Sequence, residues 1–330
     1  MLDFVLLLGS LALLLTAANY FVEGISAIAA SLGVPPLVIG MTVVAFGTST
    51  PELVINTMSA AQGSTDLAFG NIVGACLVNV GVVLAVTAIM APLRVESALI
   101  TRELPMLSVT VAAIVVLGSD QFLDGAAGSA WTRGDGLILL LLFGIFLYYT
   151  TWGALGASRK DTFLEDVADE TARTPKKPLW VQIGFTLGGL AGVSFGADWT
   201  VDFAVQIARG MGVSEAVIGL TIISVGTTLP ELATCILAAR RGDADLALGN
   251  VVGSNLFNLL CIGGVVSVIR PIPIPAGGQV DLVVMAALSM MLLPLALRGR
   301  HVISRWEGAF LLLVYLGFLS WRLTQVAQSH

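Results

Sequence analysis

Two acidic residues lie within stretches of sequence that are otherwise apolar, and each belongs to a similar motif. Glu52 lies in Gly-Thr-Ser-Thr-Pro-Glu-Leu (47–53), and Glu231 lies 179 positions later in Gly-Thr-Thr-Leu-Pro-Glu-Leu (226–232). A carboxylate inside a bilayer is costly unless it is paired, and it commonly marks an ion or proton pathway. The two motifs therefore predict a cation pathway.

Each motif also contains a proline and hydroxyl groups that suit a cation site. Pro51 and Pro230 lack an N–H group, so a helix through either motif should break or kink there. Such a break is tolerated in a membrane only where the backbone faces protein or water, and the freed carbonyls upstream can then bind a cation. Four hydroxyls lie beside the predicted breaks: Thr48, Ser49, Thr227 and Thr228.

The apolar stretch after each motif adds a polar stripe. The second copy has Asn250, Ser254 and Asn258 at i, i+4 and i+8, and the first copy has Asn71, Ala75 and Asn79. Gly70-x-x-x-Gly74 and Gly249-x-x-x-Gly253 predict close approach of helices. Because asparagines also hold membrane helices together, these amides are candidates either for the site or for helix packing.

The oxygen groups favour particular ions. Oxygen ligands on flexible groups suit Ca²⁺ and Na⁺, whereas Mg²⁺ needs tighter octahedral geometry and zinc or copper favour N and S ligands. Two carboxylates match one Ca²⁺ in charge. An empty site with two unpaired carboxylates is unfavourable, so we expect obligatory exchange of cations or protons. A purely structural carboxylate pair would not require breaking prolines and flanking hydroxyls in both copies.

The composition indicates an all-α polytopic membrane protein. The chain has 330 residues, 56% hydrophobic and 12% charged, with a mean hydropathy of +0.92. Ten apolar stretches approach the roughly 20 residues that span a bilayer; they lie at about 3–31, 36–61, 67–91, 98–118, 135–156, 180–208, 215–239, 246–269, 280–297 and 304–325. Most of the 16 Lys and Arg residues fall on one side of this layout, which predicts both termini outside. The lipid bilayer is the expected environment, and nucleic acid is not an expected partner.

The chain divides into two repeats. We predict a first five-helix repeat at 1–156, a charged cytoplasmic linker at 157–178 and a second five-helix repeat at 179–330. An odd number of spans per repeat inverts the second copy, as in secondary transporters with broken helices, here helices 2 and 7. Two copies in one chain predict a functional monomer.

The paired motifs, each followed by Gly-Asn-x-x-Gly, resemble the two alpha repeats of the cation/calcium exchanger superfamily, especially its prokaryotic sodium/calcium exchangers. The resemblance implies that spans 2, 3, 7 and 8 enclose the site, while spans 1 and 6 slide across it. It also implies a location in the prokaryotic inner or plasma membrane. The metal ligands that it implies are Glu52, Glu231, Thr48, Ser49, Thr227, Thr228, Asn79, Asn258, Ser254 and the carbonyls of Ala45 and Ser224.

Two positions depart from the family pattern. Ala75 stands where the family usually has the serine that matches Ser254, so the sodium stoichiometry is left open. Asn258 stands where many relatives, including the potassium-dependent ones, carry Asp. The loss of that carboxylate argues against potassium co-transport.

The resulting prediction is a secondary active antiporter, not an enzyme, that exchanges Ca²⁺ for Na⁺ by alternating access, with no cofactor. Exchange of Ca²⁺ for H⁺ is the first alternative, because carboxylates also bind protons. A cation channel is the second, although a channel needs a continuous pore. Three further carboxylates, Glu23, Asp198 and Asp202, are candidates for an ion entrance or for solvated span ends.

Overall fold

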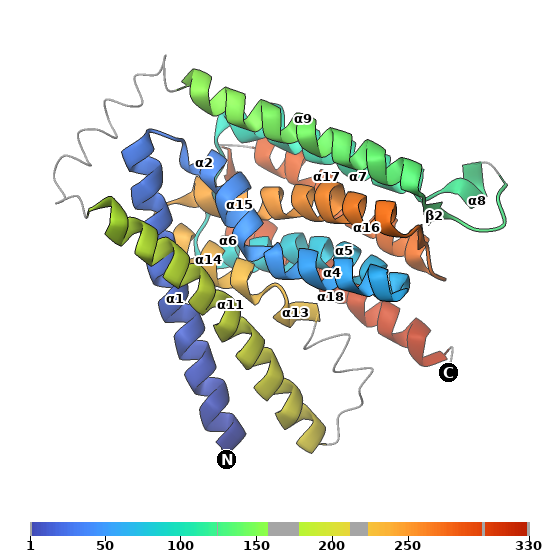
Figure 1. Cartoon of the computed structure of the whole chain (residues 1–330), viewed down its shortest axis with the longest axis horizontal. Coiled ribbons are helices and arrows are strands. Elements are labelled where there is room, and N and C mark those ends of the chain that lie inside the picture. The colour runs from blue at the N-terminus through green and yellow to red at the C-terminus, as the bar shows by residue number, and fades with distance from the viewer. Residues whose placement is uncertain (1, 124, 158–177, 212–223, 299–300, 329–330) are drawn as a thin grey trace. The chain divides into compact units, whose positions relative to one another are not determined.

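The computed structural model describes residues 2–123, 125–157, 178–211, 224–298 and 301–328 (Figure 1). The predicted linker (157–178) lies outside this description except for its two end residues, as do residues 215–223 of the predicted seventh span. The chain forms two compact units, Met1–Thr48 with Gly144–Asn250 and Ser49–Phe143 with Val251–His330. Each unit takes residues from both halves of the sequence.

The first unit is helical in the residues that are described. Its elements are α1 (Leu2–Leu32), α2 (Pro36–Ile39), the π-helical turn η1 (Gly40–Val44), α3 (Ala45–Thr48), α11 (Leu179–Gly210), α13 (Ser224–Gly226) and α14 (Leu229–Arg240). Two further helices, α9 (Arg133–Ala157) and α15 (Ala244–Leu256), begin in one unit and end in the other.

The second unit combines helices with two short antiparallel β-ribbons, β1–β4 and β2–β3. Its helices are α4 (Thr50–Gln62), α5 (Thr65–Val78), η2 (Asn79–Leu84), α6 (Ala85–Met90), η3 (Leu99–Glu103), α7 (Leu104–Leu117), α8 (Asp120–Leu123), η5 (Phe257–Ile262), α16 (Gly263–Ile269), α17 (Gly278–Leu297) and α18 (Arg305–Gln328). Its strands are β1 (Leu93–Arg94), β2 (Ala130–Trp131), β3 (Ile272–Pro273) and β4 (Val302–Ile303).

The described helices are long and apolar enough for a membrane protein. Eight of them could each cross a bilayer, and the bent pair Pro36–Thr48 and Thr50–Gln62 would make a ninth span. Many large apolar side chains on these helices are exposed, for example Val109, Leu137 and Leu313, which is the pattern expected of surfaces that face lipid. The complete set of ten spans stays a prediction.

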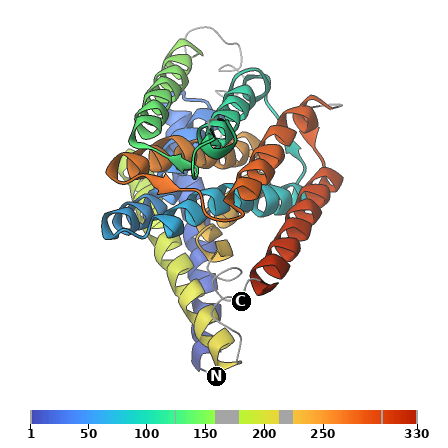
Figure 2. The same ribbon diagram turned by 90° about the vertical axis from the view of Figure 1, so that its right-hand side faces the viewer.

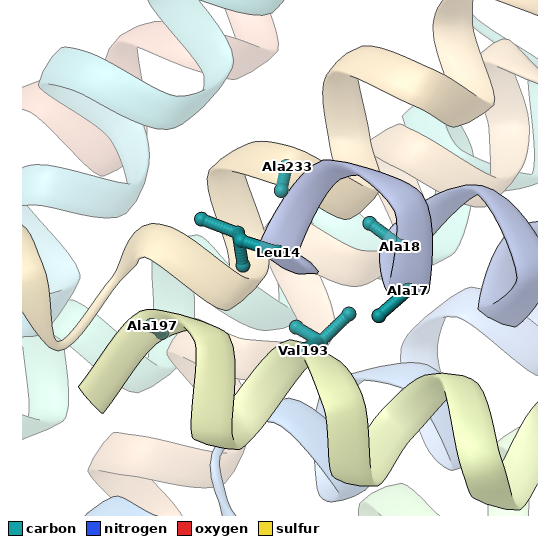
Figure 3. Close-up of a cluster of buried hydrophobic side chains, with 6 residues drawn as sticks. All are labelled: Leu14, Ala17, Ala18, Val193, Ala197 and Ala233. Atoms are coloured by element: carbon teal, nitrogen blue, oxygen red, sulfur yellow. The ribbon is translucent and has the colours of Figure 1, made fainter. Parts of the chain in front are cut away.

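Within the first unit, α1 and α11 lie side by side along much of their length (Figures 1 and 2). Small and branched apolar residues fill their interface with α14 (Figure 3): Leu14, Ala17 and Ala18 on α1, Val193 and Ala197 on α11, and Ala233 on α14. The hydroxyl of Thr200 donates a hydrogen bond to that of Ser10 at 3.0 Å across the two helices. Small residues of this kind allow membrane helices to approach closely.

Glycines set how closely α11 approaches α1. A Cβ atom at Gly189 would lie 2.5 Å from the Phe21 backbone nitrogen, and one at Gly196 would lie 2.8 Å from that of Leu14. Gly192 also contacts α1, whereas a Cβ at Gly188 would meet no described atom within 4 Å. Of the three glycines spaced four residues apart on α11, Gly188, Gly192 and Gly196, the last two therefore contact α1.

In the second unit, α17 packs on α7, and α18 packs on α6 and η2. The β-ribbons connect distant loops: Leu93 pairs with Ile303, and Trp131 pairs with Ile272. The ring of Trp131 is fully buried and lies 5.5 Å from that of Phe69 on α5. These contacts fix α5, the helix that leads to Asn79.

Candidate cation-binding site

The helix that leads to Glu52 is interrupted just before it. Helix α3 ends at Thr48, Ser49 has φ −92° and ψ 7°, and α4 begins at Thr50, with a bend of 47° at the break. Pro51 lies in the first turn of α4, where its missing N–H group would have no helical partner in any case. The interruption predicted from the motif is thus present, and it places the buried Glu52 carboxylate, 3% exposed, in the first helical turn.

The second motif repeats this local geometry. Helix α13 ends at Gly226, Thr228 has φ −100° and ψ 8°, and α14 begins at Leu229 with a proline in its first turn. Glu231 is 1% exposed and again lies in the first turn. A helix N-terminus carries unpaired N–H groups and a partial positive charge, so both carboxylates lie where their negative charge is stabilised.

Hydroxyl groups line both interruptions. Thr48 is fully buried and donates its hydroxyl hydrogen to the carbonyl oxygens of Val44 at 3.1 Å and Ala45 at 3.4 Å. Thr228 is 2% exposed and donates to the carbonyl oxygen of Val225 at 2.9 Å. Because each hydroxyl donates its one proton to a carbonyl oxygen, the lone pairs of the hydroxyl oxygen remain available to bind a cation.

The remaining predicted ligands near the interruptions differ in burial. Ser49 is fully buried and Thr227 is partly buried. Ala45 lies in α3 and is fully buried, and Ser224 begins α13.

The amide candidates lie at π-helical turns. Turn η2 begins at Asn79, and turn η5 contains Asn258, the corresponding residue of the second repeat. Such π-helical turns often occur at functional sites because they shift the side chains of one helical turn out of register. Asn79 and Asn258 are 1% and 2% exposed, and Ser254 is fully buried. Among the described residues, the Oδ1 atoms of Asn79 and Asn258 have no hydrogen-bond partner.

The predicted ligands are divided between the two units. The second unit holds one set of oxygen groups: Ser49, Glu52, Asn79, Ser254 and Asn258. The first unit holds the other: Ala45, Thr48, Ser224, Thr227, Thr228 and Glu231. Each unit therefore contributes one buried carboxylate with its neighbouring oxygens, and the sharing of one ion by both carboxylates stays a prediction.

Asn250 holds helices together. Its Nδ2 atom donates to the hydroxyl of Thr234 at 3.2 Å and contacts the Cys235 sulfur at 3.3 Å, which ties α15 to α14. Gly249 beside it packs closely as predicted, since a Cβ there would lie 2.5 Å from the Leu37 carbonyl oxygen. At Gly70 and Gly74 a Cβ would meet no described atom within 4 Å, but the residues that correspond to Leu37 and Gly40 (216 and 219) lie outside the described residues, so close approach there stays a prediction.

Two amides that sequence reasoning missed lie close to the candidate ligands. Asn56, 1% exposed, donates from Nδ2 to the Glu52 carbonyl oxygen at 2.7 Å. Asn255, which is fully buried, accepts a hydrogen bond at Oδ1 from Asn79 Nδ2 at 3.0 Å. The sequence marks them only by a difference between the repeats: Cys235 stands at the position that corresponds to Asn56, and Cys76 at the position that corresponds to Asn255. Neither amide is therefore duplicated.

Glu23 belongs to a polar network at the connection between α14 and α15. Arg241 donates to the Asn19 amide oxygen at 2.7 Å and forms an ion pair with Glu23 at 3.5 Å. Ser26 donates to the Asp243 carboxylate at 2.9 Å. Glu23 thus takes part in an ion pair between α1 and this connection, whereas Asp198 and Asp202 are exposed on α11.

The pH dependence of stability should reflect Asp243. Burial raises the pKa of Asp243, and the hydrogen bond from Ser26 and the charge of Arg241 offset this only in part. In the unfolded chain the carboxyl of Asp243 has a pKa of about 3.9, so it releases its proton at a lower pH than in the folded state. The free energy of unfolding therefore falls as the pH rises from the unfolded-state pKa to the folded-state pKa. We expect Asp243→Asn to melt at a higher temperature than the wild type at neutral pH.

Melting curves of both proteins in detergent, recorded from acidic to neutral pH, check this expectation. The advantage of the Asn variant should shrink as pH falls through the window, because the wild-type carboxyl then becomes neutral as well. A pH-independent difference, or a less stable variant at neutral pH, would refute it.

These features define a class of protein: a polytopic helical membrane protein with a buried carboxylate after a helix interruption in each of two similar sequence motifs. No group of three or more His, Cys, Asp or Glu residues that could hold a metal occurs in the described part of the chain. The groups that lie beside the two carboxylates in the sequence are hydroxyl, amide and carbonyl oxygens, which are ligands that hard cations accept.

Comparison with known proteins identifies the family. The model of the sodium/calcium exchanger protein family matches residues 2–152 and 181–324, and the chain belongs to that family. It is 37% identical to the putative antiporter CaxA of Alkalimonas amylolytica over 95% of this chain and 96% of that protein. It is 34% identical to the inner membrane protein YrbG of Escherichia coli, over 96% of each.

A solved structure shares the fold. The sodium-calcium exchanger NCX_Mj, soaked with Na⁺ and Ca²⁺, superimposes with a TM-score of 0.81 at 30% sequence identity, covering 97% of this chain and 98% of that one. The likeness thus extends over nearly the whole of both chains.

Proposed function

We propose that this protein is a secondary active antiporter that exchanges Ca²⁺ for Na⁺ across the membrane. One observation carries the proposal: in both repeats a buried carboxylate lies in the first turn of a helix that follows an interruption, beside buried hydroxyls. A lone structural carboxylate would not need this arrangement twice. Family membership and the similarity to a sodium-calcium exchanger structure support the choice of ions.

In this proposal Glu52 and Glu231 bind one Ca²⁺ between them. The accessory ligands are the hydroxyls of Thr48, Ser49, Thr227, Thr228 and Ser254, the amide oxygens of Asn79 and Asn258, and the carbonyls of Ala45 and Ser224. Na⁺ replaces Ca²⁺ because the two carboxylates must be neutralised by bound cations while they are inside the membrane. Obligatory occupancy of this kind produces exchange and prevents a leak.

The departures from the family pattern refine the ion set. Asn258 supplies an oxygen without a charge, which leaves two carboxylates and favours Ca²⁺ with Na⁺ over a potassium-dependent cycle. Ala75 has no hydroxyl, so the site that Ser254 helps to form has no counterpart in the first repeat. We propose that this chain therefore binds Na⁺ less symmetrically than its relatives do.

The proposed architecture has ten spans in two inverted repeats, with both termini outside and the charged linker in the cytoplasm. The bent pair at Pro36–Thr48 and Thr50–Gln62 supports a broken second span. The name of the inner membrane relative supports the plasma membrane as the location. Because one chain contains both repeats, we propose that a monomer carries out exchange.

Uptake of radiolabelled Ca²⁺ into proteoliposomes loaded with Na⁺ tests the proposal. The proposal predicts uptake when external Na⁺ is low, and no uptake when Na⁺ is equal on both sides. A pH gradient without a Na⁺ gradient should drive none. Uptake that follows the pH gradient and ignores Na⁺ would replace Na⁺ with H⁺ as the counter-ion, and no uptake under either gradient would overturn Ca²⁺ antiport.

A further inference from the structure

The Asn79 amide has its nitrogen engaged and its oxygen available. Nδ2 of Asn79 donates to Oδ1 of Asn255 at 3.0 Å, and both side chains are buried. Within the described part of the chain, Oδ1 of Asn79 has no hydrogen-bond partner. A buried acceptor without a partner is costly, so this oxygen requires a ligand of its own.

The orientation of an asparagine amide decides whether it can bind a cation. Its two ends have nearly the same size, but the oxygen accepts and the NH₂ group only donates. If the NH₂ group of Asn79 faced the cation, it would repel the ion. An acceptor on the opposite side, such as Asn255 Oδ1, keeps the NH₂ group turned away.

Asn258 has no equivalent acceptor in the first repeat. The residue that corresponds to Asn255 is Cys76, and the residue that corresponds to Asn79 is Asn258. The Cys76 thiol lies 3.9 Å from the Asn255 carbonyl oxygen and acts there as a weak donor. Of these two asparagines, only Asn79 therefore has an amide at the position of Asn255 to accept from its Nδ2.

We infer that Asn255 is a positioning residue for Ca²⁺ binding: it accepts a hydrogen bond from Asn79 and so presents the Asn79 oxygen to the ion. The inference rests on the proposed function, because it assumes that Asn79 is a Ca²⁺ ligand. Asn255 acts through Asn79, so its contribution should vanish when the Asn79 amide is removed.

A double-mutant cycle on Ca²⁺ binding to the purified full-length protein tests the inference. Asn255→Leu, which removes the acceptor but fills the space, should weaken Ca²⁺ binding about tenfold, the equivalent of one lost hydrogen bond to a ligand. Asn79→Ala should weaken binding by at least as much. The double variant should bind Ca²⁺ no more weakly than Asn79→Ala alone, because residues that act through one another are not additive.

A second variant separates positioning from packing. Asn255→Asp keeps an acceptor for Asn79 Nδ2 and should retain at least wild-type Ca²⁺ affinity, even if Asn255→Leu folds poorly. Three results would each overturn the inference without contradicting the proposal of Ca²⁺ exchange. They are additive losses of affinity in the double variant, unchanged binding in Asn255→Leu, and a tenfold loss of affinity in Asn255→Asp. A wild-type protein that binds no Ca²⁺ would overturn the proposed function as well.

Discussion

Replacing either Glu52 or Glu231 with Gln should abolish Na⁺-driven Ca²⁺ uptake while leaving the protein folded. Gln has the same shape as Glu and retains an oxygen, but it removes one of the two negative charges that we propose for the site. A unit charge a few Å from a divalent cation is worth several kcal/mol when water is largely excluded. We therefore expect Ca²⁺ affinity to fall by about a hundredfold or more in each single variant.

A carboxylate of the same repeat provides the control. Asp66 lies in the first turn of α5, shortly after Glu52, but its side chain is exposed. Asp66→Asn also removes one negative charge and should transport Ca²⁺ at close to the wild-type rate. Near-normal uptake by the Glu52 or Glu231 variant would remove that residue from the site.

Replacing Gly249 with Ala should disrupt folding of the first unit. The added Cβ would lie 2.5 Å from the Leu37 carbonyl oxygen and 3.3 Å from the Gly40 Cα atom, so it would meet backbone that cannot rotate away. Insertions into well-packed interiors typically cost about 1–3 kcal/mol, and contacts with backbone fall at the upper end. We expect a lower yield of monodisperse protein and a markedly lower melting temperature.

Another glycine of the first unit supplies the control. Gly188 lies within α11, and a Cβ there would meet no described atom within 4 Å. Gly188→Ala should change stability by no more than about 0.5 kcal/mol, as expected for a site without close contacts. Equal melting temperatures for the two variants would contradict the close packing of α15 on α2 and η1.

Features that depend on one residue type within one helix were predictable from the sequence. The proline requires a helix start, so the interruptions near Pro51 and Pro230 followed from the motifs alone. The burial of Glu52 and Glu231 followed from the apolar stretches around them. Local chemistry and local hydropathy were sufficient in these cases.

Features that depend on a neighbouring helix were not predictable. Gly188 and Gly189 are neighbours on α11, yet of these two only Gly189 contacts the described backbone of α1, because sequence spacing does not reveal which face of a helix packs on its neighbour. The amide pair of Asn79 and Asn255 joins residues 176 positions apart, so no helical period could indicate it.

Local changes in the backbone hydrogen-bond pattern of a helix were also not predictable from the sequence. The π-helical turns at Asn79 and Asn258 add a residue to one helical turn, and hydropathy with a period of 3.6 does not register this change. A polar stripe drawn on an ideal helix therefore identified Asn258 as a candidate ligand but could not predict the direction of its side chain. The shared π-helical turns are a property of the repeats that only the structure revealed.

Equilibrium binding of radiolabelled Ca²⁺ to the purified protein tests the central proposal most directly, that Glu52 and Glu231 hold one exchangeable ion together. The proposal predicts one Ca²⁺ per wild-type chain, its displacement by added Na⁺, and loss of that binding in Glu52→Gln and in Glu231→Gln separately. Wild-type affinity in either variant, or bound Ca²⁺ that Na⁺ does not displace, would contradict it.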